Sequence, residues 1–361
     1  MLGIYLGFER RDFCHRFAFA ALGSDIRIQA SSLERTLVSI IIVNWRSIGY
    51  LRTCLDSIYK NVNDIHFETI VIDNGSFDGC KKLIEKEFPS AIFIQNEQNS
   101  GFSRANNLAV RRASGEYLLF LNPDTEIVES AFGELANHLE RFPQVGIVGC
   151  RVLNSDLTIQ QYYLHAFPTL LNRSLNIDLL KRTFPKWKLW GIGALYEYAG
   201  EAVTVDAISG CCMLVRKKAF EKVGGFSESF FMYTEDVDLS LKMKNAGFGV
   251  QYIGKGEVIH HGRKSAGLQA QTNFADIMVI QSTALFFLKT RGAFYAQAYR
   301  MLIGCSALVR LMTVALLMLV GGFIFHRRWV HATWRKWTLI LRWAISSGER
   351  SRLSLPVRST N

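Results

Sequence analysis

The stretch LLFLNPDTEIV, residues 118–128, decides the fold of this chain, because an apolar run passes directly into a polar turn. The run from Tyr117 to Leu121 is apolar throughout, which is typical of a strand buried on both faces in the middle of a parallel sheet. Ligands of open α/β sheets bind beyond the carboxyl ends of such strands. The carboxylate of Asp124 is therefore predicted to lie at a ligand-binding edge.

Short apolar strands alternate with helices on both sides of this stretch. Strands are predicted at 37–43, 68–72, 91–95 and 145–149, and helices at 48–60, 80–88, 103–113 and 129–141. Strands separated by single helices indicate βαβ units and a parallel sheet. We therefore predict an α/β fold with a mostly parallel, Rossmann-like sheet flanked by helices.

The regular alternation stops between residues 161 and 203, where aromatic residues accumulate without clear periodicity. A segment of this kind is either a binding loop or a packing insertion, and the sequence leaves both open. Order returns with an apolar strand at 208–215 and a helix from Lys217. A later helix is predicted to begin after Thr234 as its N-cap and to end at Gly247, which puts Glu235 and Asp236 in its first turn.

The charge of the chain is concentrated at its C-terminal end. The net charge is +11, and residues 289–361 carry twelve Lys and Arg against the single acid Glu349. The same region contains the most apolar run of the chain, Leu311 to Phe325, so a membrane surface is a better partner for it than nucleic acid. The seven cysteines show no metal-ligand spacing and indicate reduced core thiols.

The apolar C-terminal run is short for a membrane span. Residues 301–325 include Arg310, which leaves fifteen uncharged residues after it, whereas a spanning helix needs about 20. Basic residues flank the run on both sides, so we favour an in-plane or re-entrant attachment over a single span. Residues 330–344 show one apolar and one polar helical face, which also indicates attachment.

Four groups of polar residues stand at predicted ends of strands or helices. They are VIDNGSFDG at 71–79, NSGFSRANN at 99–107, the Asn-Pro-Asp turn at 122–124, and TEDVD at 234–238 together with HHGRKS at 260–265. Taken singly, each has an ordinary structural explanation: an Asx turn, a helix cap, a type I turn, or charge compensation of a helix dipole. Their occurrence in this order is the informative observation.

That order, from Leu37 to Ser265, resembles the family 2 glycosyltransferases with a GT-A fold, and among them the rhamnosyltransferase-like branch. VSIIIVNW at 38–45 and the long segment at 209–248 add to the resemblance. It implies that Asp236 is the catalytic base, that Asp124 belongs to the metal motif, and that His260, in preference to His261, contacts the metal or diphosphate. It also implies a donor site formed by Asn44, Asp73 at the nucleotide base, Asn74, Ser76, Asn99, Gly101, Asn107 and Asn122.

The chain departs from the family pattern at the metal motif. The motif often written Asp-x-Asp is Asn122-Pro123-Asp124 here, and an asparagine offers only a neutral oxygen. Metal affinity is therefore expected to be weak until the diphosphate of the donor joins the site. The rhamnosyltransferase-like branch commonly shows this variant.

The resemblance implies an inverting displacement at the anomeric carbon of a nucleotide-diphospho-sugar, assisted by Mg²⁺ or Mn²⁺. The first expectation is rhamnose as the sugar and a lipid-linked saccharide as the acceptor, in cell-surface polysaccharide synthesis at the cytoplasmic face of the inner membrane. Nucleic acid is not expected as a partner. The alternatives are a donor such as a UDP-sugar, and a catalytically silent nucleotide-sugar-binding membrane adaptor. A nucleotidyltransferase is disfavoured because no basic glycine-rich loop follows the first strand.

Three regions are predicted along the chain. Residues 1–35 form an N-terminal extension of unclear structure, and residues 36–288 form the glycosyltransferase domain, with a donor half at about 36–150 and an acceptor half at about 151–288. Residues 289–361 form a basic, apolar region for membrane association.

Overall fold

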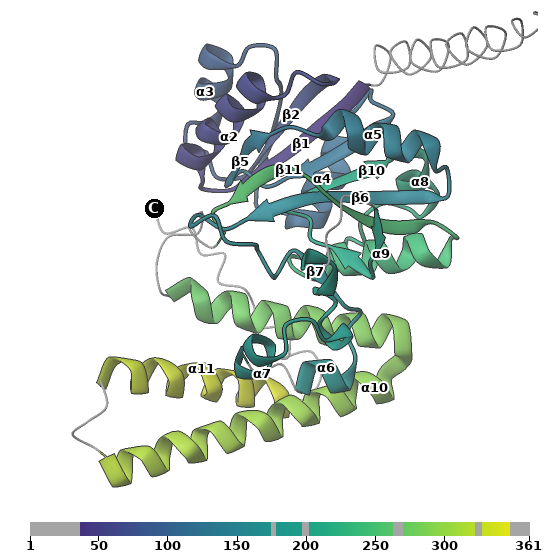
Figure 1. The fold of residues 1–361 in the computed structure, drawn as a ribbon. Coiled ribbons are helices and arrows are strands. Elements are labelled where there is room, and N and C mark those ends of the chain that lie inside the picture. The colour runs from purple at the N-terminus through teal and green to yellow at the C-terminus, as the bar shows by residue number, and fades with distance from the viewer. Residues whose placement is uncertain (1–36, 175–177, 197–201, 263–269, 322–326, 347–361) are drawn as a thin grey trace, which may run out of the picture.

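A mixed β-sheet forms the centre of the protein (Figure 1). The structure is a computed structural model that describes residues 37–174, 178–196, 202–262, 270–321 and 327–346. The predicted N-terminal extension lies outside these residues. The strand order along the main path of the sheet is β3-β2-β1-β4-β10-β6-β11-β5, and β8 pairs with β11.

The first half of the sheet is parallel and confirms the predicted βαβ units. Its strands are β1 (Leu37–Asn44), β2 (His66–Asn74), β3 (Ile92–Asn96) and β4 (Tyr117–Leu121). Helices α2 (Ile48–Asn61), α3 (Cys80–Glu87) and α4 (Phe102–Val110) connect them. The buried residues of α2 recur every three or four positions, which is the spacing of one helical face.

The second half of the sheet mixes strand directions. Strand β10 (Cys212–Arg216) runs antiparallel to both β4 and β6 (Val145–Leu153). Strand β11 (Gly249–His260) is parallel to β6 and antiparallel to the short strand β8 (Val203–Thr204). Helix α8 (Lys217–Lys222) follows β10, and helix α9 (Glu235–Asn245) precedes β11.

The structure corrects the sequence prediction at residues 125–129. These residues form strand β5 (Thr125–Glu129), and helix α5 (Phe132–Arg141) begins later than the predicted start at residue 129. Strand β5 pairs antiparallel with the end of β11, so that His260 lies opposite Thr125. A pairing between segments so distant in the chain overrides the local preference for a turn followed by a helix.

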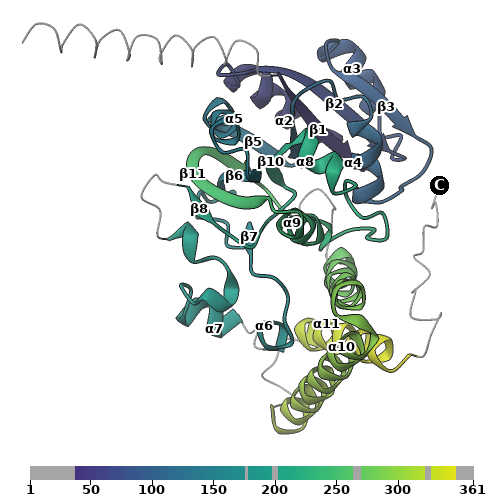
Figure 2. The same cartoon turned by 90° about the vertical axis from the view of Figure 1, so that its right-hand side faces the viewer.

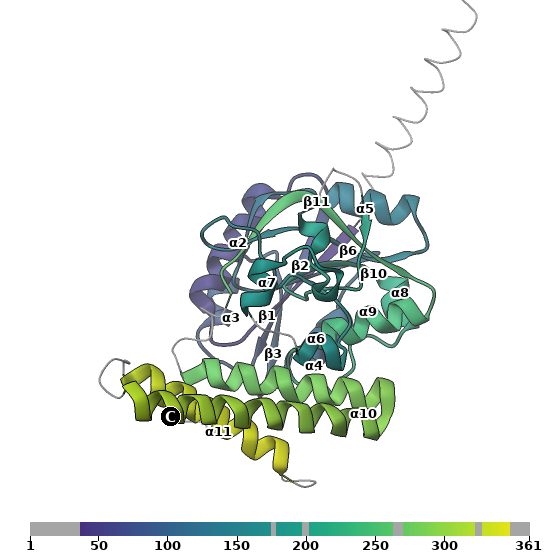
Figure 3. The same cartoon turned by 60° about the horizontal axis from the view of Figure 1, so that its bottom comes forward.

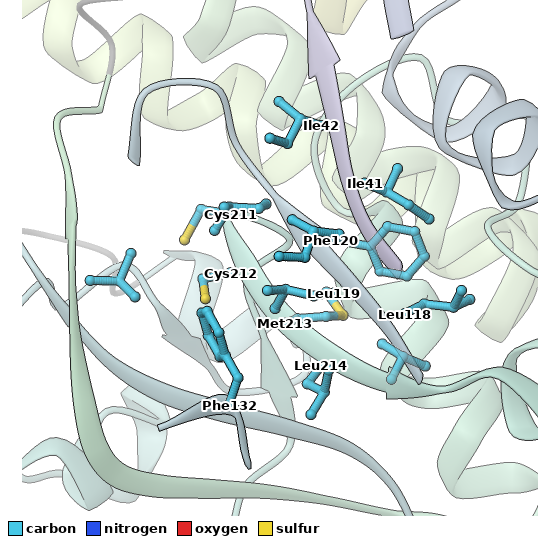
Figure 4. Packing of buried hydrophobic residues seen from close by; sticks show 14 of the residues in the cluster. Ile41, Ile42, Leu118, Leu119, Phe120, Phe132, Cys211, Cys212, Met213 and Leu214 are labelled. Carbon is cyan, nitrogen blue, oxygen red and sulfur yellow. The ribbon is translucent and has the colours of Figure 1, made fainter. Parts of the chain in front are cut away.

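The core lies between the sheet and its flanking helices (Figure 4). The run that follows Tyr117 is fully buried, as predicted, and Leu118, Leu119 and Phe120 have no exposed surface. Phe120 meets Phe226 edge to face, with ring centroids 4.9 Å apart. Five of the six described cysteines are buried and free, which confirms the prediction of core thiols.

The aromatic segment before β8 forms short elements rather than one loop. They are β7 (Leu164–His165), which pairs with β9 (Ala207–Ile208), α6 (Leu170–Ser174), α7 (Asp178–Thr183), and 3-10 turns at Lys188–Trp190 and Gly193–Leu195. Tyr163 is buried and donates to the carbonyl of Cys212 at 2.7 Å, whereas Tyr162 is 66 % exposed. The buried Tyr163 confirms that part of this segment is packing structure, and its use as a binding loop stays a prediction.

The C-terminal helices form a separate layer below the sheet (Figures 1 and 3). Helix α10 (Ala270–Gly321) bends at Gly292, whose φ of 84° and ψ of 175° are not helical, and α11 (Arg327–Ile345) packs along it. Within α10, the stretch Phe274–Met318 is long and apolar enough to cross a membrane, judged by length and composition alone. The predicted domain boundary at residue 288 falls inside α10.

The predicted apolar face of α11 packs only in part against α10, because Trp334 on that face is 41 % exposed. Trp337 and Leu341 pack against a buried cluster that contains Ala307 and Ile340, and Arg310 lies over the Trp337 ring at 4.4 Å. Exposed apolar residues lie instead along the second half of α10, from Phe294 to Met318. An amphipathic pattern shows that one face is buried, but it does not show what buries it.

Candidate active site

The candidate site lies at one rim of the sheet, where β1, β2 and β4 end and β10 begins. Helix α9 lies between the sheet and the first part of α10 (Figure 2). The amide of Asn122, just after β4, donates to the carbonyl of Cys211 at 2.9 Å. The amide of the preceding residue, Gly210, donates to the Asp236 carboxylate at 3.1 Å. Two consecutive residues before β10 therefore connect the Asn-Pro-Asp turn to the first turn of α9.

Asp73, at the end of β2, holds a polar turn at this rim. Its carboxylate is buried and accepts hydrogen bonds from the amide of Phe77 at 3.0 Å and from the side chain of Gln95 at 2.9 Å. Asn44 at the end of β1 donates to it at 3.1 Å, and Ser76 also donates. The structure thus brings Asn44, Asp73 and Ser76 together, and a contact of Asp73 with a nucleotide base stays a prediction.

A network of amide side chains fixes the loop before α4. Asn74 donates to the side chain of Asn99 at 3.0 Å, and the amide of Gly101 donates to Asn99 at 3.0 Å. Gly101 has a φ of 86°, and a Cβ placed there would lie 2.5 Å from the carbonyl oxygen of Phe231. Only glycine permits this approach, and it brings the loop against the segment that leads into α9.

Asn107 lies farther along α4 and serves a packing role. Its side chain donates to the carbonyl of Phe226 at 2.9 Å and accepts from the amide of Phe226 at 3.0 Å. Both ends of the amide are therefore engaged by backbone. A contact of Asn107 with a donor stays a prediction.

Asn122, Asp124 and His260 form a second cluster at the rim. The Nε2 atom of His260 lies 3.3 Å from Oδ1 of the buried Asp124 carboxylate and 3.2 Å from Nδ2 of Asn122. The other ring nitrogen, Nδ1, contacts Oε1 of Gln160 at 2.8 Å. With Nδ1 directed at Gln160, Nε2 faces Asp124 and Asn122, where it could ligate a metal ion once it gives up its proton.

The donor set fits a divalent cation. Two ligand atoms that each lie about 2.1 Å from one ion, at a right angle, are about 3 Å from each other. The distance between Oδ1 of Asp124 and Nε2 of His260, 3.3 Å, is close to that value. Gln160 orients the imidazole as outer partners of metal-bound histidines do. Among the described residues, no group of three His, Cys, Asp or Glu side chains could hold a metal ion, so further oxygen ligands would have to come from a substrate.

The electrostatics of this cluster favour positive charge. Burial, the largest effect, lowers the pKa of His260, but Cys211 and the Asp124 carboxylate outweigh it and raise that pKa to about 10. The surroundings that favour a proton on Nε2 favour a cation there as well. By contrast, the ring nitrogens of His261 contact Glu126 at 2.6 Å and Ser155 at 2.9 Å, so His261 is engaged elsewhere.

Asp236 lies in the first turn of α9, as predicted. One carboxylate oxygen accepts from the amide of Gly210 and the other from the amide of Val237 at 2.8 Å. Thr234 precedes the helix as predicted, but its φ is 70° and its side chain makes no capping hydrogen bond. Thr234 thus stands at the N-cap position, but the prediction that its side chain caps the helix was wrong, because capping side chains typically bond from an extended backbone and Thr234 is left-handed.

The aromatic segment faces Asp236 from the other side. Burial lowers the pKa of the His165 imidazole, and the charge of Asp236 partly offsets this effect. Burial likewise lowers the pKa of Arg173, again with Asp236 opposing. Both residues border a small cavity of about 50 Å³, which Tyr162 and Trp190 also line. A polar recess with aromatic walls thus lies within electrostatic range of Asp236.

Sequence reasoning did not find Gln160, His165 or Arg173. Each lies in or next to the stretch without periodicity, where no local pattern marks a residue as facing the rim. Their roles arise from contacts with β11 and α9, which are distant in the chain. The one available signal was that aromatic and polar residues accumulate after residue 161.

The family model named Glycosyl transferase family 2 matches residues 39–224, which is more than half of the chain. The chain belongs to glycosyl transferase family 2. This glycosyltransferase is 28 % identical over 234 residues to the rhamnosyltransferase WbbL of Escherichia coli K12, a match that covers 62 % of this chain and 83 % of WbbL. It is 28 % identical over 220 residues to the N-acetylglucosaminyl-diphospho-decaprenol L-rhamnosyltransferase of Mycobacterium tuberculosis, covering 57 % of this chain and 70 % of that one.

Another relative is the O-antigen biosynthesis protein RfbC of Myxococcus xanthus, which is 29 % identical over 229 residues. That match covers 62 % of this glycosyltransferase but only 17 % of RfbC. Among solved structures, the mannosyltransferase PcManGT of Pyrobaculum calidifontis, in complex with GDP-Man and Mn²⁺, aligns with a TM-score of 0.47 and 17 % identity. That alignment covers 86 % of this chain and 88 % of the other.

Glu235 generates a prediction on how the stability of this glycosyltransferase depends on pH. Burial, reinforced by the charge of Asp236, raises the pKa of Glu235 well above its ordinary value near 4.5. The folded protein therefore keeps a proton that the unfolded chain has lost, and stability falls as the pH rises above that ordinary value. A glutamine at this position has no proton to keep, so the stability of Glu235→Gln does not fall in this way. The melting temperature of Glu235→Gln minus that of the wild type should therefore increase between about pH 5 and about pH 8.

The matched control is Glu221→Gln, because Glu221 is an exposed residue. Its melting temperature should follow that of the wild type at every pH. A constant difference between Glu235→Gln and the wild type across the pH range would contradict the assignment of a protonated Glu235.

Proposed function

We propose that this glycosyltransferase transfers a sugar from a nucleotide-diphospho-sugar to a saccharide acceptor with inversion at the anomeric carbon. The observation that carries the proposal is the placement of Asp236 at the same rim as Asp124 and His260, linked through the consecutive residues Gly210 and Cys211. An inverting transfer needs one base for the acceptor hydroxyl and a separate site for the leaving diphosphate. We assign the first role to Asp236 and the second to Asp124 and His260.

Asp236 is the proposed base. The amides of Gly210 and Val237 fix both oxygens of its carboxylate, so a hydroxyl group can approach in only a limited range of directions. We place the acceptor sugar outside the recess of His165 and Arg173, against its exposed aromatic wall at Tyr162, because the recess itself is too small for a sugar ring. Asp236 then takes the hydroxyl proton as the oxygen attacks the anomeric carbon.

Asp124 and His260, with the Asn122 side chain beside them, would hold Mg²⁺ or Mn²⁺ together with the diphosphate of the donor. A bound cation of this kind neutralises charge on the departing nucleoside diphosphate. Gln160 fixes the imidazole of His260 through Nδ1. The chain's own part at this end of the site is to orient the diphosphate and to keep His260 pointed at it.

We propose rhamnose as the donor sugar and a lipid-linked diphospho-saccharide as the acceptor. The support is that WbbL is named a rhamnosyltransferase and the Mycobacterium tuberculosis relative is named for a decaprenol-linked diphospho-sugar. The C-terminal helices lie against the domain that carries the rim, and we place them at the cytoplasmic face of the inner membrane, where such an acceptor is available. The product would enter cell-surface polysaccharide synthesis.

The first test concerns Asp236. Asp236→Asn should lower the transfer rate by about 10²–10⁴-fold, because the amide cannot accept the acceptor proton. Release of nucleoside diphosphate is measured over a panel of dTDP-, UDP- and GDP-sugars, with the exposed Asp56→Asn as the control that should keep wild-type rates. A wild-type transfer rate in Asp236→Asn would contradict the assignment of Asp236 as the base. If the wild-type protein binds donors but turns over none of them, the result favours a catalytically silent adaptor.

The second test concerns the cation. A chelator should abolish transfer, and added Mg²⁺ or Mn²⁺ should restore it. Gln160→Leu removes the partner of His260 Nδ1 and should raise the metal concentration needed for half-maximal rate by about 10–100-fold, with less effect on the rate at saturating metal. Transfer that is unchanged by the chelator would contradict the proposed metal dependence.

The third test concerns the acceptor. A detergent-solubilised lipid-diphosphate saccharide should be glycosylated much faster than the same saccharide without its lipid, because the proposed site combines the aromatic wall at Tyr162 with an adjacent membrane surface. Initial rates are compared at equal acceptor concentrations. Equal rates on both acceptors would count against a lipid-linked substrate while leaving the transferase assignment intact.

A further inference from the structure

A second cavity, of about 540 Å³, lies between α9 and α10 and is separate from the rim. Its polar lining comprises Ser227, Asp238, Lys242, Asn245, Lys289, Thr290 and Arg291. Three of these residues, Asp238, Lys242 and Asn245, lie on α9 at spacings of three or four residues and therefore share one face of that helix. Asp236 lies two residues before Asp238, which places it about 200° around the helix axis from that face. The cavity therefore opens on the side of α9 that faces away from the candidate base.

The charges in this cavity are unbalanced. Asp238 is buried and lies 3.9 Å from the ammonium of Lys242 and 3.8 Å from that of Lys289. One carboxylate is thus shared by two ammonium groups, and Arg291 adds a third cation to the lining. Burial, chiefly, lowers the pKa of Lys242, and Lys289 adds to the effect. The lining has an excess of positive charge that an anion would balance.

Exposed apolar residues flank the part of α10 that lines the cavity. Arg291 directly precedes the bend at Gly292, and the residues on either side, Leu288 and Phe294, are 50 % and 89 % exposed. An exposed apolar stripe then continues along the second half of α10 at intervals of seven and four residues, through Met301, Leu308, Met312 and Leu316. A cation-lined recess beside a continuous apolar stripe matches a molecule with a phosphate at one end and a hydrocarbon chain at the other.

We propose that this cavity binds the phosphate headgroup of an anionic membrane phospholipid. Lys289 and Arg291 contact the phosphate, and the acyl chains lie along the stripe that begins at Phe294. A soluble phosphate ligand would use the same cations but would have no use for the stripe. The site is independent of the transferase chemistry, because it lies on the opposite face of α9 from Asp236.

The test is binding of the full chain to vesicles. Phosphatidylcholine vesicles that contain phosphatidylglycerol are compared with vesicles of equal negative charge that contain oleate instead, which has no phosphate. The wild type should prefer phosphatidylglycerol, and Lys289→Gln should reduce that affinity by about tenfold, as expected for loss of a charged contact to the headgroup. Asn245→Trp should do the same, because it obstructs the cavity without changing the charge.

The control variant is Lys81→Gln, which makes the same charge change at an exposed lysine on α3 and should alter affinity by less than about twofold. Equal losses for Lys81→Gln and Lys289→Gln, or wild-type affinity of a correctly folded Asn245→Trp, would overturn the proposal in favour of diffuse charge attraction. A further measurement, with inorganic phosphate, tests whether the cavity binds a soluble phosphate ligand instead of a lipid. If it raises the melting temperature of the wild type but not of Lys289→Gln, while every variant binds vesicles equally, the lipid assignment is overturned.

Discussion

The antiparallel insertion of β10 between β4 and β6 is the constraint on which the site depends. Because β10 runs opposite to β4, with Cys212 opposite Leu121, the residues that precede β10 must lie where β4 ends. That placement lets Cys211 bond the amide of Asn122 and lets Gly210 bond Asp236. In a sheet with β10 reversed, Gly210 would lie at the opposite edge, and α9 would have no anchor beside Asp124.

The parallel half of the sheet was predictable because its signals are local. Each of its strands is a short apolar run, and each connecting helix has apolar residues on one face, so neither depends on a distant partner. Strand β5 has no such signal, since TEIVE reads equally well as a turn before a helix. Its pairing with β11, about 130 residues later, decides the outcome, and a single sequence does not reveal a pairing at that range.

The sequence was sufficient to predict which residues lie at the rim, but not which hydrogen bonds they make there. Carboxylates and amides at strand ends are marked by position alone, and Asp124, His260 and Asp236 do gather at one rim. The partners that orient them, such as Gln160 for His260, depend on where an irregular segment crosses β11. A hydrogen bond requires placement to within a few tenths of an ångström, and no periodicity in the sequence encodes placement at that precision.

The first C-terminal helix, α10, shares a buried cluster with α9, the helix that carries Asp236. Val237, next to Asp236, shares a buried cluster with Phe230, Phe286 and Phe287, which joins α9 to α10. Ser282 on α10 also donates to the carbonyl of Met232 at 2.8 Å, just before α9 begins. Since packed cores deform little, this shared cluster couples the orientation of α10 to the orientation of α9 and the rim. The proposed attachment of these helices to a membrane would therefore also set the direction from which the proposed acceptor reaches Asp236. The bend at Gly292 separates this packed part of α10 from its second half, where the exposed apolar residues lie.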